Sequence, residues 1–171
     1  MSAALFADRV GLAYRTPMEV VGGFLDRAPV PLLDMAAALG LSVDMGASLP
    51  AGISGQITHI RRADGDRYHI DVNGQDGAAR RRFTLAHEIA HFLLHRAFLD
   101  DALTDDRMYR SRLGDVMERQ ANRLAAQLLM PANLVRVAWN AGARDVASLA
   151  RTFDVSGQAM EIRLRELGLE G

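Results

Sequence analysis

The chain of 171 residues carries 20 basic and 21 acidic side chains, a formal net charge of −1, and 49% of its residues are hydrophobic. This length suits one ordinary domain with a sizeable core. The near-zero charge argues against a whole-surface attraction to nucleic acid or to an anionic membrane. The absence of cysteine excludes disulfides, thiolate metal sites and cysteine nucleophiles. All the basic residues are arginines, which excludes lysine Schiff-base chemistry and the P-loop lysine.

The first ten residues carry an aspartate and an arginine, Asp8 and Arg9, before any long apolar run develops. This pattern is not that of a signal peptide. No stretch approaches 18 consecutive apolar residues, so no membrane span is expected. We therefore expect a cytoplasmic protein.

The first half of the chain predicts helices followed by a β-hairpin. Residues 1–30 suggest a helix with frayed ends, and 31–39 a short helix with proline in its first turn. After residue 40 the spacing of apolar residues is no longer helical, and residues 53–60 are typical of one strand. In residues 68–72 apolar and polar side chains alternate, as in a second strand. An Asp-Gly-Asp turn at 64–66 joins the two strands into a predicted hairpin.

The second half of the chain predicts helices. Residues 83–94 are apolar around most of the helix, which indicates a central, buried helix. Residues 96–114 are rich in aspartate and arginine and predict a solvated connection. Further helices are expected over about 115–130, over 131–140, and as a pair within 145–169 that splits near Asp154. The order of helix, hairpin and helices indicates an α+β fold.

Three of the five histidines lie within nine residues, and two of them form the pattern H-E-x-x-H at His87-Glu88-x-x-His91. On a helix, residues four apart share a face, so both imidazoles can converge on one ion. Glu88 is rotated by about 100° from His87, where a general base can take a proton from the water that the ion activates. The alternative is a chance match with histidines that satisfy core hydrogen bonds. The strongly apolar helix favours the functional interpretation, because burying these groups without a role is costly.

A hydrolytic zinc site needs a third protein ligand and an open position. His95 lies eight residues beyond His87, about 12 Å along a helix, so we expect it to support the site or the core. Glu118 is the better candidate, because it shares a helical face with two alanines and Asn122. The alanines would allow close approach, and Asn122 would orient a histidine. The alternative for Glu118 is a solvated glutamate that complements the helix dipole.

Three segments together resemble the ImmA/IrrE family of intracellular metallopeptidases: Arg82–His95 with its HExxH, Glu118-x-x-Ala121-Asn122, and Leu128–Pro131. The resemblance covers most of the chain and includes the upstream Ile-Ser-Gly at 53–55 and the pattern of the tail. It implies that His87, His91 and Glu118 are the metal ligands and that Glu88 is the general base. Two histidines, one carboxylate and water suit Zn²⁺, with Mn²⁺ or Fe²⁺ as alternatives.

The resemblance also implies a zincin-like fold, in which a small three-stranded sheet packs on the HExxH helix and a helical C-terminal part follows. We divide the chain into a metallopeptidase domain, 1–140, and a small helix-turn-helix-like segment, 141–171. The tail from residue 145 carries three arginines and five acids, so direct binding to nucleic acid is not expected.

Family resemblance implies that the protein is a zinc-dependent metalloendopeptidase. Its expected substrate is a partner helix-turn-helix (Xre-type) transcriptional repressor or antitoxin, whose cleavage derepresses a regulon. The alternative is a toxin or regulator of a toxin–antitoxin pair that forms a stable complex with the antitoxin and has a self-inhibited metal site. The oligomeric state is left open.

Several further residues are candidates for the substrate side of the site. We expect strand 67–73 to present an edge to an extended substrate. The arginines at 80–82 suggest either a solvated helix start or a contact for an acidic substrate. Tyr109 is the candidate oxyanion donor, with Arg110 and Arg112 as alternatives. His59 and His69 are expected to be ordinary strand residues.

Overall fold

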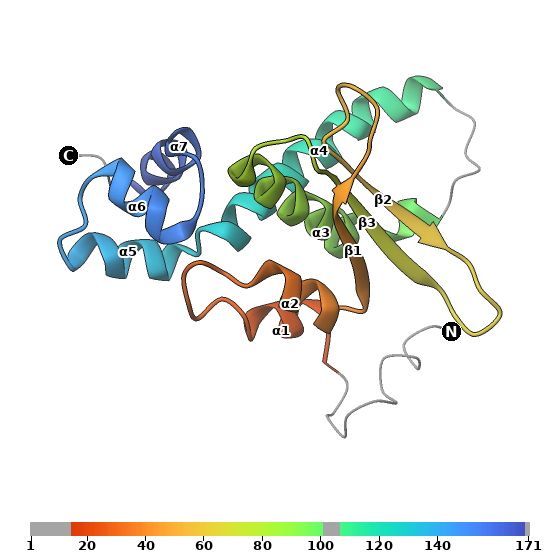
Figure 1. Ribbon diagram of the computed structural model, residues 1–171, viewed down its shortest axis with the longest axis horizontal. Coiled ribbons are helices and arrows are strands. Elements are labelled where there is room, and N and C mark those ends of the chain that lie inside the picture. The colour runs from red at the N-terminus through yellow and green to blue at the C-terminus, as the bar shows by residue number, and fades with distance from the viewer. Residues whose placement is uncertain (1–14, 101–106, 170–171) are drawn as a thin grey trace.

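The computed structural model describes residues 15–100 and 107–169, but not the side chains of residues 100 and 107–113. In chain order its elements are α1 (Pro17–Gly22), α2 (Leu32–Ala38), β1 (Leu41–Ala47), β2 (Gly55–Ile60), β3 (Arg67–Asn73), α3 (Ala78–Asp100), α4 (Arg107–Leu129), α5 (Ala132–Asn140), α6 (Val146–Phe153) and α7 (Gly157–Leu167). Figure 1 shows the sheet and α5–α7 at opposite ends of the molecule. The predicted α+β, zincin-like class is confirmed, with a small three-stranded sheet and helices around it.

The three strands have the order β1-β3-β2. The predicted hairpin is confirmed, because β2 pairs antiparallel with β3. However, β1 pairs parallel with the other side of β3. The expectation that strand 67–73 presents an edge is therefore wrong, and the edges belong to β1 and β2. The sequence pattern predicts no strand over residues 41–47, and it is this strand that pairs with the second side of β3.

The central helix α3 contacts both β2 and β3 on one side and α4 on another. Its apolar side chains, including Leu85, Ile89 and Phe92, are buried together with Ile70 and Val72 of β3. Full burial of a side chain of this size stabilises the fold by about 1.5–3 kcal/mol. The predicted central, buried helix is confirmed.

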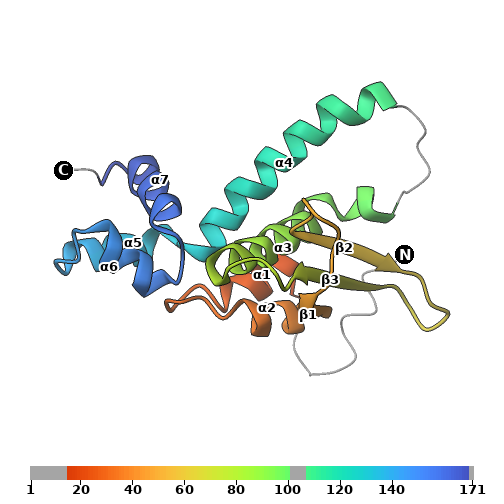
Figure 2. The same cartoon turned by 45° about the horizontal axis from the view of Figure 1, so that its top comes forward.

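The predicted connection over residues 96–114 is largely helical. Helix α3 continues to Asp100 and α4 begins at Arg107, as the long helix in Figure 2 shows. Charged residues suit a solvated helix face as well as a loop, so composition did not separate the two. Further along α4, Ala121 and Ala125 are fully buried, as expected for the close approach of α3 and α4.

The first helices and the tail follow the predicted pattern in part. Only Pro17–Gly22 is helical between residues 15 and 30, and residues 1–14 lie outside the described part. The short helix predicted over 31–39 is confirmed as α2, and the tail forms two helices that split at Asp154. Of the helices in the described ranges, none combines the length and apolar character needed to cross a bilayer.

Polar contacts attach the C-terminal helices to the rest of the chain. The buried guanidinium of Arg163 donates from Nε to the carbonyl of Met130 at 3.1 Å and pairs with Glu166 at 3.0 Å. Arg82 of α3 pairs with Asp154 at 3.6 Å.

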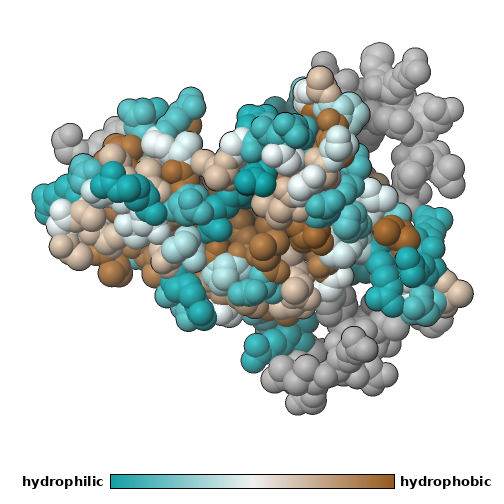
Figure 3. All heavy atoms as spheres, viewed as in Figure 1, coloured by the Kyte–Doolittle hydropathy of each residue, from teal (hydrophilic) through white to brown (hydrophobic). Residues whose placement is uncertain are grey.

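Hydrophobic side chains gather near the middle of the face seen in Figure 3, around α2 and α3. The division of the chain at residue 140 stays a prediction.

Gly55, the first residue of β2, permits the close approach of this strand to α3. A Cβ at this position would overlap Thr84 and would lie 3.1 Å from the Asp71 carbonyl and 3.3 Å from a Glu88 carboxylate oxygen. We expect Gly55→Ala to lower the free energy of unfolding by about 1–3 kcal/mol, because overpacking forces neighbours apart. Urea titration measures the change.

Gly22→Ala is the matched control, since nothing lies within 4 Å of a Cβ added at that position. It should leave the unfolding free energy within about 1 kcal/mol of the parent protein. An equal loss in both variants would contradict the close-packing role of Gly55.

Candidate metal centre

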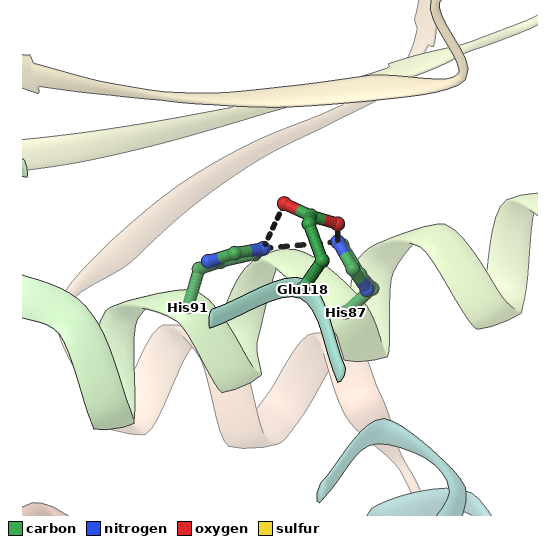
Figure 4. A group of neighbouring side chains, drawn as sticks. All are labelled: His87, His91 and Glu118. Carbon is green, nitrogen blue, oxygen red and sulfur yellow. Dashed lines mark hydrogen bonds and ion pairs between the residues drawn. The ribbon is translucent and has the colours of Figure 1, made fainter. Parts of the chain in front are cut away.

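Two histidines of α3 and one glutamate of α4 converge on one point (Figure 4). His87 and His91 lie one helical turn apart, and their Nε2 atoms are 3.0 Å from each other. The Glu118 carboxylate lies over both rings, with Oε2 at 3.3 Å from His87 Nε2 and Oε1 at 3.2 Å from His91 Nε2. These three groups could hold a metal ion, and their ligand atoms all lie within 4.8 Å of one another.

The spacing of these atoms fits a tetrahedral ion. Zinc binds imidazole nitrogen and carboxylate oxygen at about 2.0–2.1 Å, so tetrahedral neighbours stand about 3.3 Å apart. The two Nε2 atoms are 3.0 Å apart, and each lies 3.2–3.3 Å from a different oxygen of Glu118, close to this value. Two imidazoles and one carboxylate also leave a position for water or substrate, as in hydrolytic zinc sites.

Asn122 determines which nitrogen of His87 faces the centre. Its Oδ1 lies 3.0 Å from His87 Nδ1, and an amide oxygen only accepts hydrogen bonds. His87 therefore carries its proton on Nδ1 and directs the lone pair of Nε2 toward Glu118 and His91. A cation placed among these lone pairs and the carboxylate would be attracted by all of them. The predicted contact between Asn122 and a histidine is confirmed.

Glu88 lies beside this cluster and is almost fully buried, with 7% of its surface exposed. Burial, and secondly the charge of Glu118, raise the pKa of Glu88 to about 7. Burial and the neighbouring His87 lower the pKa of His91. A carboxyl that titrates near neutrality can both accept and return a proton, as a general base must.

A pocket of about 360 Å³ opens next to His87. His87, Glu88 and Asn122 line one part of it, and the remaining lining is Gly52, Ile53, Ser54, Gly55, Arg80, Phe83 and Thr84. The pocket thus connects the three-residue cluster to the start of the edge strand β2.

Comparison with known proteins identifies the family. A family profile described as the IrrE N-terminal-like domain, Peptidase_M78, matches residues 51–165. The chain belongs to this family. Membership in a family of metallopeptidases implies a metal cofactor, and the cluster of two histidines and a glutamate could hold it.

Two curated relatives carry the description radiation response metalloprotease IrrE. The protein from Deinococcus deserti is 36% identical over 165 residues, which cover 82% of this chain and 58% of the relative. The protein from Deinococcus radiodurans is 30% identical over 156 residues, covering 77% and 47%. The chain therefore spans about half the length of these IrrE relatives.

A solved structure described as a Mycobacterium tuberculosis transcriptional regulator shares the fold. It superposes with a TM-score of 0.55 at 22% identity, over 86% of this chain and 46% of the other. At this identity the likeness concerns the fold alone.

The structure brings together His87, Glu88, His91 and Glu118 of this IrrE-like chain, as the sequence predicted, although their chemical roles remain a proposal. Tyr109 belongs to α4, but its side chain lies outside the described part, as do those of Arg110 and Arg112.

The remaining histidines take up different positions. His59 of β2 stacks on Tyr68, and His69 of β3 bonds to Ser42 and Asp71. Neither lines the pocket beside the cluster. His95 touches His91 but is not among the three grouped ligands.

The three arginines at the start of α3 have different surroundings. Arg80 lines the pocket and donates to Ser54 Oγ at 2.9 Å. Arg81 donates to the carbonyl of Met45 at 3.3 Å, and Arg82 to that of Val30 at 2.6 Å. Of these three arginines, Arg80 alone lines the pocket and could contact an acidic substrate there. Arg81 and Arg82 instead bind backbone carbonyls of other segments.

Gln120 was not predicted as part of the site, and its Oε1 lies 3.0 Å from His95 Nε2. Gln120 is two residues from Glu118, and residues two apart do not share a helical face. In addition, α3 departs from helical geometry at His95 (φ −125°, ψ 18°), although no glycine or proline lies there. Helical spacing offered no signal for this contact.

The raised pKa of Glu88 predicts a pH-dependent stability of the metal-free protein. Between the ordinary value of 4.5 and about 7, the folded state holds a proton that the unfolded state has released. The contribution of Glu88 to the free energy of unfolding is therefore fully present below pH 4.5. It is lost as the pH rises through 7, and the total loss is on the order of 3 kcal/mol. In urea titrations, Glu88→Gln should match the parent at pH 5 and exceed it at pH 8.

Glu161→Gln, at an exposed position of α7, is the control and should follow the parent at both pH values. A stability difference between Glu88→Gln and the parent that does not change with pH would contradict the burial of an ionisable Glu88.

Proposed function

We propose that this protein is a metal-dependent endopeptidase in which His87, His91 and Glu118 hold Zn²⁺, and Glu88 is the general base. The observation that carries the proposal is the convergence of two imidazole nitrogens and one carboxylate, whose ligand atoms lie within 4.8 Å of one another, beside a buried carboxyl. Mn²⁺ is the alternative, because the affinity order of a site does not decide which metal a cell supplies.

The metal, when bound, polarises the scissile carbonyl and makes water more acidic. Glu88 accepts a proton from the water that attacks the carbonyl carbon. It then returns this proton to the nitrogen that leaves as the amine when the C–N bond breaks. Its pKa near 7 suits both transfers. Tyr109 of α4 remains our candidate donor to the oxyanion.

The edge of β2 is the proposed binding site for the substrate backbone. The N–H of Asn73 donates to the Ser54 carbonyl at 2.8 Å, and hydrogen-bonded pairs alternate along an antiparallel ladder. The register of β2 and β3 therefore directs the main-chain groups of Gly55 and Ile57 away from β3. An extended peptide adds to this edge and places one side chain in the pocket beside His87.

We propose that the substrate is a helix-turn-helix (Xre-type) transcriptional repressor or antitoxin. Its cleavage would derepress the genes that it controls, and the reaction would take place in the cytoplasm. This choice of substrate rests on the resemblance to the ImmA/IrrE family, and the relatives named radiation response metalloproteases support the proteolytic part of the proposal. A substrate with an acidic group would meet Arg80 at the pocket.

The cleavage test uses purified protein, stripped of metal with a chelator and reloaded with Zn²⁺ or Mn²⁺. The partner is the helix-turn-helix protein encoded beside its gene. Mass spectrometry should detect two new fragments of the partner, and Glu88→Gln should slow their formation by about 10²–10⁴-fold.

Glu161→Gln should cleave at the parent rate. Cleavage that persists in Glu88→Gln would overturn the assigned base. An intact partner that co-purifies with the protein and is not cut with either metal would instead support a toxin or regulator that acts by stable complex formation.

Hydrogen exchange tests the substrate edge in the Glu88→Gln protein, which keeps its substrate intact. Binding of the partner should slow amide exchange at Gly55 and Ile57, because their N–H groups become donors to the added strand. The amides of β1, the other edge of the sheet, are the internal control. Slowed exchange along β1 instead of β2 would contradict the proposal.

A further inference from the structure

A chain of three side chains extends from the centre to the surface of α4. His91 Nε2 faces Glu118, and its other ring nitrogen, Nδ1, lies 3.2 Å from His95 Nδ1. The Nε2 atom of His95 lies 3.0 Å from Gln120 Oε1. Both nitrogens of each imidazole are thus engaged.

The chemistry of the last member determines the direction of every hydrogen bond. Because Gln120 Oε1 only accepts, His95 must carry its proton on Nε2 and donate it to this oxygen. A neutral imidazole has one N–H, so His95 Nδ1 is an acceptor. The proton in the contact between the two Nδ1 atoms therefore belongs to His91, and its Nε2 keeps a lone pair that points at Glu118.

The structure holds His95 in place for this contact. Its side chain is buried, with 4% of its surface exposed, and α3 leaves helical geometry at this residue. The side chains of the arrangement come from α3 and α4, the same two helices that supply the three grouped ligand residues. The contacts of His95 with His91 and with Gln120 therefore make the orientation of the His91 ring depend on how α3 and α4 pack.

We infer that His95 and Gln120 are positioning residues that hold His91 in the tautomer and orientation needed to bind a metal through Nε2. This inference rests on the proposed metal site. Asn122 orients His87 directly, because its Oδ1 accepts a hydrogen bond from His87 Nδ1 at 3.0 Å. Hydrogen bonds of this kind to a ligating histidine contribute about 10- to 100-fold to metal affinity.

The test measures zinc affinity by competition with a chromophoric chelator, in the full chain. His95→Phe keeps a ring but removes both polar atoms, and should raise the zinc dissociation constant by about 10- to 100-fold. His95→Asn places an amide oxygen near the position of Nδ1, and should return the constant to within a few-fold of the parent value. If His95 only filled space, His95→Phe would bind zinc more tightly than His95→Asn.

Gln120 offers a second pair of variants at an exposed position, where folding is not at risk. Gln120→Leu removes the acceptor and should raise the dissociation constant, whereas Gln120→Glu keeps an acceptor and should not. Gln127→Leu, on an exposed position of the same helix, is the control and should leave the constant unchanged.

Nitrogen-15 NMR of the zinc-loaded parent reads the proton positions directly. We expect His95 to be protonated on Nε2 and His91 on Nδ1. Protonation of His95 on Nδ1, or an unchanged zinc affinity in both His95→Phe and Gln120→Leu, would overturn the inference. If the parent protein binds neither Zn²⁺ nor Mn²⁺, the proposed function fails instead.

Discussion

The close packing of α4 on α3 is the contact on which the site depends. Glu118 is 27 residues from His91 along the chain, and it reaches the two imidazoles only because α4 crosses α3 at short range. Two fully buried alanines, Ala121 and Ala125, follow Glu118 on the same helical face. Larger side chains at these positions would separate the helices, and a helix displaced by one or two ångströms would no longer place the carboxylate at 3.2–3.3 Å from both rings.

Burial and charge act together at this crossing. The apolar surroundings that stabilise α3 also disfavour the ionised form of Glu88, and the nearby Glu118 carboxylate adds to that effect. Polar partners therefore matter more here than at the surface. Asn122, His95 and Gln120 engage the ring nitrogens that face away from the centre. The same contacts limit the directions in which the lone pairs beside Glu118 can point.

The sheet determines where a substrate can lie relative to the centre. Because β1 occupies one side of β3, the hairpin presents β2 as its outer strand. The absence of a side chain at Gly55 lets this strand approach Thr84 and Glu88. Gly55 also lines the pocket, together with His87 and Glu88. In the proposed binding mode, the substrate backbone, one substrate side chain and the proposed reactive groups therefore lie close together.

Within a single helix, the positions of the candidate site residues follow from the sequence alone. A helical period and the spacing H-E-x-x-H placed His87, Glu88 and His91, and the spacing from Glu118 to Asn122 placed a ligand candidate and its neighbour, because positions on one helix follow from its geometry. Tertiary structure alone decided which strand is an edge, which arginine lines the pocket, and that Gln120 meets His95. These contacts join segments far apart in the chain, where helical and strand periods carry no information.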